Sequence, residues 1–269
     1  MSRVAIGFTV FAILAGAAAA AAQLRTGAEV AAGPTIVLAE LFTSEGCSSC
    51  PPADRLLETL LKQQPASGVY VVPLSEHVDY WDHQGWKDPF GSPQFTERQK
   101  IYGARFNIDS IYTPQLVIDG TNEFVGSDEG ELRRVLAKAA REPKPLLQVE
   151  VTGAGPETAI AIHGPGLATR MGEATELMLA VTEDDLVVDV KRGENAKRTL
   201  RHSGVVRLLR SLGDPRSNPP PRGAVDAGMA VVNTTLSIKP EWKRDKLRVV
   251  AFVQAKQTRR VLSVGWRAF

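Results

Sequence analysis

The sequence predicts two consecutive domains, an α/β domain followed by a mainly antiparallel, β-sandwich-like domain. Residues 35–42 and 68–74 are nearly continuous apolar runs, which are typical of strands covered on both faces. From residue 147 onward, short runs alternate apolar with polar or small residues at regular spacing, a pattern that favours antiparallel strands. Between the two patterns, Arg141-Glu142-Pro143-Lys144-Pro145 has the composition of a linker.

The first half alternates strands and helices. After residues 35–42 comes a helix with one apolar stripe (Leu56, Leu57, Leu60 and Leu61), and after the strand at 68–74 comes a helix over 95–106. A hairpin follows, formed by 115–120 and 123–126 around the turn Asp119-Gly120. The last helix starts at Ser127-Asp128, where Asp128 and Glu131 have the spacing of a capping box.

The second half consists of predicted strands, with an ambiguous segment at 205–209. The strands are expected over residues 147–151, 159–162, 176–181, 186–190, 231–238, 247–253 and 261–264. We find no nucleophile, cysteine or histidine cluster among them. The expected organisation is a signal peptide (1–22), an N-terminal linker (23–33), the α/β domain (34–141), a linker (142–146) and the β-rich domain (147–269).

The first 22 residues have the pattern of a secretory signal. Arg3 is followed by an uncharged run from Val4 to Ala22, which ends in small residues. The alternative is a retained membrane anchor, since nineteen uncharged residues are just long enough to span a bilayer. With the signal removed, we predict no stable membrane span and a protein located in the periplasm or secreted. That oxidising compartment allows disulfides to persist.

The net charge of the chain limits the classes of partner that we expect. Removing residues 1–22 takes away only Arg3, so the formal net charge falls from +2 to +1. A near-neutral chain with both signs interspersed gives no reason to expect nucleic acid as a partner. We predict no cofactor. The expected partner is a protein or a small thiol that exchanges electrons with the chain.

The two cysteines of the chain, Cys47 and Cys50, form a C-x-x-C motif between the first predicted strand and the first predicted helix. A helix N-terminus supplies partial positive charge and free N–H groups, which stabilise a thiolate on Cys47. Cys50 lies one turn further in, so we expect it to be more buried and less reactive. The motif alone is also compatible with a metal clip or a structural disulfide.

This order of elements, with C-x-x-C at the start of the first helix, resembles the thioredoxin fold. Thr113-Pro114 strengthens the resemblance, because thioredoxin-like proteins have a cis proline beside the disulfide at this place. Since proline donates no ladder hydrogen bond, the neighbouring backbone is free to pair with a substrate strand. We therefore predict a cis bond, with Cys47, Cys50 and Pro114 as catalytic residues and Thr113 at the substrate-binding surface.

Taken whole, the chain resembles a secreted bacterial family known only as domain of unknown function 1223, with a thioredoxin-like half. The residues that carry this resemblance are 41–54, His77-Val78-Asp79-Tyr80-Trp81, 112–115, Arg192-Gly193-Glu194-Asn195 and Arg201-His202. The resemblance implies a fold and a redox motif, but no known substrate.

The chain departs from thioredoxin at two places. Gly46 replaces the tryptophan that precedes the first cysteine, and residues 76–93 form an extra stretch rich in acidic and aromatic residues. This stretch follows the carboxyl end of the second strand, where open α/β sheets bind ligands. We expect it to fold over the motif and fill the space beside Gly46. His77, Tyr80 and Trp81 are then substrate-binding candidates, and the alternative is that they only fix a long loop in place.

Residues 191–210 carry a cluster of basic side chains with two possible roles. These are Arg192, Lys197, Arg198, Arg201, His202, Arg207 and Arg210. They form either an anion-binding surface that curls back towards the redox site, or a solvated segment whose arginines pair with carboxylates such as Glu183, Asp184 and Asp185.

Three function classes follow. The first is a thiol–disulfide oxidoreductase in which Cys47 attacks the substrate disulfide and Cys50 resolves the mixed disulfide. The second is a copper(I)-handling protein with Cys47, Cys50 and His77 as soft ligands. The third is a non-enzymatic binding protein with a structural disulfide.

Overall fold

A computed structural model of the chain describes residues 34–64, 68–168, 172–215 and 231–269. Residues Pro34–Phe269 form one compact unit. The predicted signal peptide (1–22) and N-terminal linker (23–33) lie outside the described residues. No helix in the described part of the chain has the length and apolar character needed to cross a membrane.

The first half has the predicted order of elements. They are β1 (Thr35–Thr43), α1 (Pro51–Gln63), β2 (Val69–His77), the short 3-10 helix η1 (Asp82–Gln84), α2 (Pro93–Phe106), β3 (Gln115–Ile118), β4 (Asn122–Val125) and α3 (Glu129–Ala139). Side chains and prolines define where the helices begin. Ser92 caps α2 by accepting from the Gln94 amide, and Asp128 caps α3 by accepting from the Glu131 amide at 2.9 Å.

The second half is built almost entirely of strands. They are β5 (Gln148–Thr152), β6 (Glu157–His163), β7 (Thr175–Glu183), β8 (Leu186–Asp189), β9 (Thr199–His202), β10 (Val205–Ser211), β11 (Val231–Ser237), β12 (Leu247–Ala255) and β13 (Val261–Ala268), with two short 3-10 helices, η2 (Pro165–Ala168) and η3 (Arg244–Lys246). The ambiguous segment at 205–209 is strand β10. Strand β9 was not predicted.

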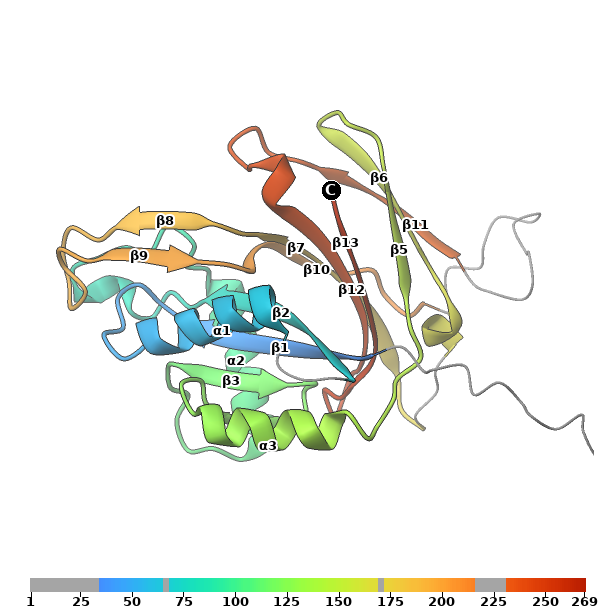
Figure 1. The fold of residues 1–269 in the computed structure, drawn as a ribbon, viewed down its shortest axis with the longest axis horizontal. Coiled ribbons are helices and arrows are strands. Elements are labelled where there is room, and N and C mark those ends of the chain that lie inside the picture. The colour runs from blue at the N-terminus through green and yellow to red at the C-terminus, as the bar shows by residue number, and fades with distance from the viewer. Residues whose placement is uncertain (1–33, 65–67, 169–171, 216–230) are drawn as a thin grey trace, which may run out of the picture. The chain divides into compact units, whose positions relative to one another are not determined.

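The predicted fold class, an α/β thioredoxin-like domain followed by a separate β-sandwich-like domain, is wrong. The described residues form one mixed eight-stranded sheet in the order β13-β12-β7-β10-β2-β1-β3-β4, which contains strands from both halves (Figure 1). The two halves join where β10 runs parallel to β2 and Val205 pairs with Ser75. A three-stranded sheet (β11-β6-β5) and the hairpin β8–β9 complete the β structure. The protein is therefore mainly β.

The large sheet is covered on both faces. One buried cluster unites α2 with strands of both halves, through residues such as Leu38, Leu74, Tyr102, Ala180 and Phe252. Because successive strand residues point to opposite faces, the neighbours of these residues belong to the other face. There, α1 and α3 cover β1, β2 and β3, whereas the three-stranded sheet covers β7 and β12. Double coverage explains why the central strands are apolar along nearly their whole length.

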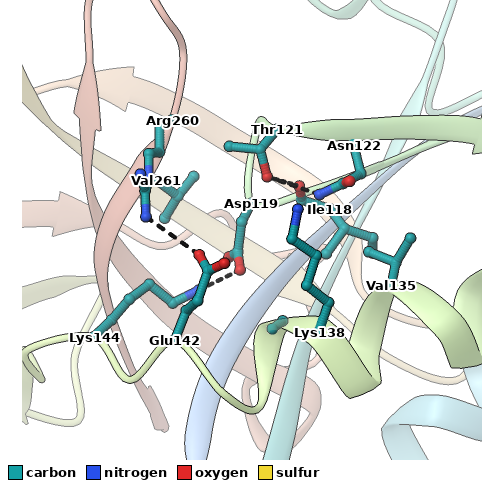
Figure 2. A pocket seen from close by; sticks show the side chains of 11 residues that line it. Ile118, Asp119, Thr121, Asn122, Val135, Lys138, Glu142, Lys144, Arg260 and Val261 are labelled. Carbon is teal, nitrogen blue, oxygen red and sulfur yellow. Dashed lines mark hydrogen bonds and ion pairs between the residues drawn. The ribbon is translucent and has the colours of Figure 1, made fainter.

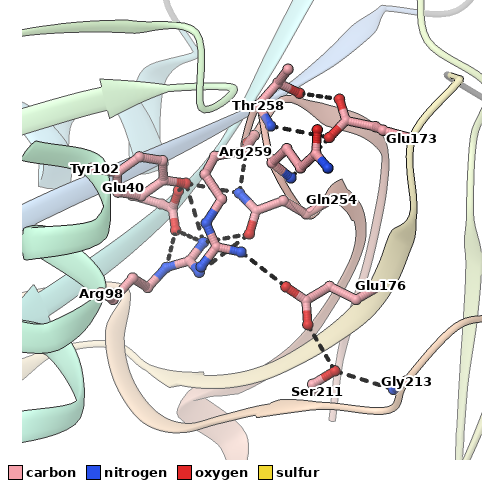
Figure 3. Close-up of polar contacts among 11 residues, drawn as sticks. Glu40, Arg98, Tyr102, Glu173, Glu176, Ser211, Gly213, Gln254, Thr258 and Arg259 are labelled. Atoms are coloured by element: carbon pink, nitrogen blue, oxygen red, sulfur yellow. Dashed lines mark hydrogen bonds and ion pairs between the residues drawn. The ribbon is translucent and has the colours of Figure 1, made fainter. Parts of the chain in front are cut away.

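A buried polar network crosses the boundary between the halves on the α2 face (Figure 3). The Arg98 guanidinium of α2 donates to the Glu40 carboxylate of β1 and to the Gln254 side chain of β12. Tyr102 donates its hydroxyl proton to Glu40 and accepts from the Gln254 amide at 2.9 Å. Because an unpaired buried charge is costly, each partner holds the others in place.

Glu76 lies beside this network without a hydrogen-bond partner for its carboxylate. Its Oε1 lies 3.5 Å from Arg98 Nε, yet neither carboxylate oxygen has a hydrogen-bond partner, and the residue has no exposed surface. Burial raises the pKa of Glu76 well above its usual range, against the opposing charge of Arg98. An acid whose pKa is higher in the folded than in the unfolded state stabilises the fold at low pH, and this contribution is lost as the pH rises through the folded pKa.

We therefore expect the free energy of unfolding of Glu76→Gln to exceed that of the wild type by about 1 kcal/mol at neutral and alkaline pH. The variant should then unfold at a higher denaturant concentration. The difference should shrink as the pH falls towards 4, where Glu76 is protonated in the folded state and mostly protonated in the unfolded state. Denaturant titrations from pH 4 to 9 measure this, with the exposed Glu97→Gln as matched control. A pH-independent difference would contradict the assignment.

Candidate functional site

The C-x-x-C motif forms a disulfide at the start of α1. Cys47 and Cys50 are bonded, and the Cys50 carbonyl accepts from the amides of Ala53 (2.9 Å) and Asp54 (3.1 Å), so the first turn of the helix begins at the motif. Pro51 occupies the first helical position, where no backbone donor is needed. Both cysteines have 0% exposed surface, so the expected difference in burial between them is absent.

The Thr113-Pro114 peptide bond is cis, as predicted, and lies against the disulfide. Cys47 Sγ is 3.8 Å from the Thr113 carbonyl oxygen and 3.4 Å from Ser49 Oγ. The Thr113 carbonyl and the Ser49 side chain therefore cover the Cys47 sulfur. The three predicted catalytic residues and Thr113 are brought together in one place.

The loop after β2 folds over the motif, as expected from its sequence. Trp81 Nε1 donates to Thr113 Oγ1 at 2.8 Å. A Cβ added to Gly46 would lie 2.9 Å from Trp81 Cβ, so the tryptophan occupies the space that a side chain at position 46 would need. Tyr80 lies next to Trp81, with ring centroids 6.4 Å apart. These aromatic side chains form the wall of the site.

His77 lies beneath this surface rather than on it. Its side chain has no exposed area, and Nδ1 is 2.7 Å from Asp88 Oδ2. The ring packs edge-to-face on Phe90 and on His202, with centroids 5.3 and 4.9 Å away. His77 therefore does not contact a substrate in this conformation.

The β8–β9 loop, residues 190–198, closes the site from the second half of the chain. Asn195 is fully buried, and its amide donates to the carbonyl oxygens of Glu45 (2.8 Å) and Cys47 (2.9 Å). The Glu194 carboxylate accepts from the Ser48 amide at 3.1 Å, inside the disulfide ring. The basic segment thus does curl back to the motif, but it contacts the motif through an amide and a carboxylate.

Five titratable side chains lie buried below the motif, and we call them the acid–histidine cluster: Glu45, Asp54, His77, Asp88 and His202. Glu45 Oε1 is 3.1 Å from His202 Nε2, and the Glu45 backbone amide donates to Asp88 Oδ2 at 2.8 Å. The cluster draws its members from the β1–α1 loop, α1, β2, the loop after β2, and β9.

The charged groups of the cluster shift one another's pKa values. Burial by itself raises the pKa of Asp88, but the charge and hydrogen bond of His77 outweigh it and lower this pKa to about 2. Burial lowers the pKa of His77, but Asp88, together with the charges of Asp54 and Glu45, outweighs burial, so the pKa of His77 is raised. The pKa of Asp54 is raised by burial, although His202, His77 and a hydrogen bond from Thr43 Oγ1 at 2.8 Å oppose this.

Among the described residues, no group of three or more His, Cys, Asp or Glu side chains is arranged to hold a metal ion. Cys47, Cys50 and His77, the copper(I) alternative, are therefore not brought together as a metal-binding group. A pocket of about 220 Å³ lies elsewhere, at the turn between β3 and β4 (Figure 2). Two of its cations are paired with carboxylates, Lys144 with Asp119 and Arg260 with Glu142, and Lys138 also lines the pocket.

Sequence reasoning missed Glu45, Asp54, Asp88 and Asn195 as site residues and gave His202 no part in the motif. One signal was available: Glu45 and Asp54 flank the motif in a segment that is otherwise apolar, small or proline. Asn195 and His202 follow the motif by about 150 residues, so only the fold brings them to it.

Comparison with known proteins decides the family. The model of a family described as "Protein of unknown function (DUF1223)" matches residues 38–254. The chain belongs to this family. No curated protein matches the chain.

Two solved structures are similar to this DUF1223 protein. One is an X-ray structure of a protein from Agrobacterium tumefaciens, with 26% identity and a TM-score of 0.60, covering 87% of this chain and 95% of that one. The other is HBP35 of Porphyromonas gingivalis, with 12% identity and a TM-score of 0.59, covering 88% of this chain and 76% of that one. The second shows a similar fold and no more.

The packing at Gly46 gives a direct test. We expect Gly46→Ala to displace Trp81 and to destabilise the protein by about 1–3 kcal/mol, because the added methyl group has no free space. Gly155→Ala is the matched control, since a Cβ there meets nothing within 4 Å. Denaturant unfolding and tryptophan fluorescence measure both effects. Equal stability of the two variants would mean that Trp81 does not pack on Gly46.

Glu194 gives a second test, because its carboxylate accepts a hydrogen bond from the Ser48 amide near the positive end of α1. A negative charge there opposes a thiolate on Cys47. We expect Glu194→Gln to lower the pKa of Cys47 by roughly 0.2–0.7 pH units in the reduced protein. The pH dependence of alkylation measures it, with the exposed Glu241→Gln as control. A raised or unchanged pKa would show that the carboxylate has left the motif.

Proposed function

We propose that this protein is a thiol–disulfide oxidoreductase that acts on a protein or small-thiol partner in the periplasm or outside the cell. The observation that carries the proposal is the Cys47–Cys50 disulfide at the start of α1, directly against the cis Thr113-Pro114 bond. The proposal rests on this site alone, because the eight-stranded sheet overturns the fold class predicted from the sequence.

The chemistry assigns one role to each thiol. In the reduced protein, the Cys47 thiolate attacks one sulfur of a substrate disulfide, a mixed disulfide forms, and the other substrate sulfur leaves as a thiolate. Cys50 then attacks the Cys47 sulfur, re-forms the intramolecular disulfide and releases the second substrate thiolate. The helix N-terminus favours the thiolate at Cys47. The same steps in reverse oxidise a dithiol.

The site needs movement before a partner can reach the sulfur atoms. Both cysteines are fully buried, with Thr113, Ser49 and the wall formed by Trp81 around Cys47. Ser48 and Ser49 are exposed, so the motif approaches the surface at these two residues. A partner therefore has to displace the Ser49 side chain or the Trp81 wall.

The same burial favours a second candidate, a structural disulfide in a binding protein. The two candidates differ in reduction potential. Disulfides of exchange proteins lie at roughly −270 to −120 mV, whereas structural disulfides lie below about −300 mV. Equilibration of the full chain with thiol buffers of defined potential separates these ranges.

For the oxidoreductase, we expect a potential within the exchange range and a clear asymmetry between cysteine variants. Cys50→Ser should accumulate a stable mixed disulfide with a substrate disulfide, because Cys47 attacks it and no resolving thiol remains, while the matched Cys47→Ser should not. Non-reducing mass spectrometry measures the adducts. A potential below the exchange range, or equal trapping by the two variants, would favour the structural disulfide.

A further inference from the structure

The acid–histidine cluster has more acidic than basic members. Three carboxyl groups (Glu45, Asp54 and Asp88) face two imidazoles (His77 and His202), and all five are at most 6% exposed. With both imidazoles neutral and every acid ionised, three negative charges would be buried together, which is very costly. The cluster must therefore hold protons, and the number it holds responds to any further charge placed beside it.

Both histidines have one nitrogen on a carboxylate and one nitrogen without a partner. His77 Nδ1 pairs with Asp88 and His202 Nε2 pairs with Glu45, while His77 Nε2 and His202 Nδ1 are buried without a hydrogen-bond partner. The ring centroids are 4.9 Å apart. Two adjacent imidazoles that each keep a free nitrogen can gain or lose a proton without breaking a carboxylate contact.

The cluster is joined to the disulfide on both sides. On the N-terminal side, Asn195 binds the carbonyl oxygens of Glu45 and Cys47 together. On the C-terminal side, Asp54 follows Cys50 by four residues, and its amide donates to the Cys50 carbonyl. Residues four apart on a helix lie on the same face, about 5–6 Å apart. A negative charge on either sulfur is therefore felt by the cluster.

We propose that the His77–His202 pair is a redox-linked proton store, which takes up a proton when the Cys47–Cys50 disulfide is reduced and releases it on oxidation. This inference rests on the proposed function and names the regulation of the same site. It is independent of which partner supplies the electrons.

The step balances with a partner dithiol as the reductant. The dithiol gives two electrons and two protons and becomes a disulfide. The Cys47–Cys50 bond breaks to give one thiol and one thiolate, so one proton goes to the thiol and the other goes to the histidine pair. The new imidazolium then offsets the thiolate charge within the buried site. Oxidation returns both protons to the partner.

Other charged groups near the pair modulate this effect. The Glu45, Asp54 and Asp88 carboxyl groups favour the protonated imidazoles. Beyond Phe90, which packs on both rings, the Arg207 guanidinium lies 5.2 Å from the Phe90 centroid and pairs with Glu183 at 3.4 Å. Arg207 opposes protonation and Glu183 offsets it, so the three carboxyl groups of the cluster dominate.

The test is a nuclear magnetic resonance titration of the imidazole ring protons in the chain without residues 1–22. The titration is done on the oxidised protein and repeated after reduction with excess dithiothreitol. The chain has four histidines, so His83→Gln with His163→Gln leaves only the two signals of the pair. A unit charge roughly 10 Å away, at an effective dielectric constant of about 20, shifts a pKa by roughly one unit. We expect the pKa of His77 or His202 to rise by about that amount on reduction.

In the wild type, His163 on β6 serves as the internal reference and should titrate identically in both states. A shift below about 0.2 units for both members of the pair, or an equal shift at His163, would overturn the inference. These measurements need no variant of a buried residue. A disulfide that dithiothreitol cannot reduce would also overturn it.

The outcomes separate this inference from the proposed function. Disulfide exchange with unchanged imidazole pKa values would remove the proton store and leave the oxidoreductase intact. Shifted imidazole pKa values without exchange or Cys50→Ser adducts would support the proton store and remove the enzymatic function.

A second measurement is the proton uptake per disulfide reduced, recorded in weakly buffered solution. This uptake should be larger in the wild type than in His77→Gln or His202→Gln variants that keep the wild-type circular dichroism.

Discussion

The hydrogen bond from the Ser75 amide to the Gly204 carbonyl oxygen, at 2.7 Å, begins the pairing that joins β10 to β2. A Cβ on Gly204 would lie 3.1 Å from the Pro73 carbonyl oxygen, and the backbone there has a positive φ of 67°, so glycine allows this close approach. Because β9 ends two residues earlier at His202, the same junction brings His202 to Glu45. The union of the two halves and the assembly of the site have a common structural cause.

That junction also accounts for a site that is buried on one side and exposed on the other. Below the disulfide, the acid–histidine cluster and Asn195 are buried and connected to several strands. Above it, Ser48, Ser49 and Glu194 are exposed: the Ser48 amide donates to Glu194, and the Ser49 side chain contacts Cys47 Sγ and the Thr113 carbonyl oxygen. A site of this kind keeps its electrostatic environment while its cover moves, and a buried disulfide needs this property if it is to react.

The sequence predicted local structure well, because local patterns carry it. The capping box at Asp128 located the start of α3, apolar periodicity located α1 and α2, although α2 begins at Pro93 rather than at residue 95, and apolar runs located most strands. The domain organisation failed for a physical reason. A strand covered on both faces has the same apolar pattern whatever its neighbours are, so β7 and β12 gave no sign that they belong to the sheet of β1 and β2. For the site, the motif and its cover were predictable from nearby residues, whereas Asn195 and His202 depend on the long-range pairing.

The position of β10 has a consequence for how the chain is made. The β2 edge that receives β10 belongs to a strand that is synthesised well over a hundred residues before Val205. While the ribosome completes the intervening segment, that edge has no partner in the native sheet, and unpaired edges of apolar strands associate readily with other chains. Since closure of such distant pairs is slow, we expect the nascent protein to be prone to association through β2 until β10 has been made.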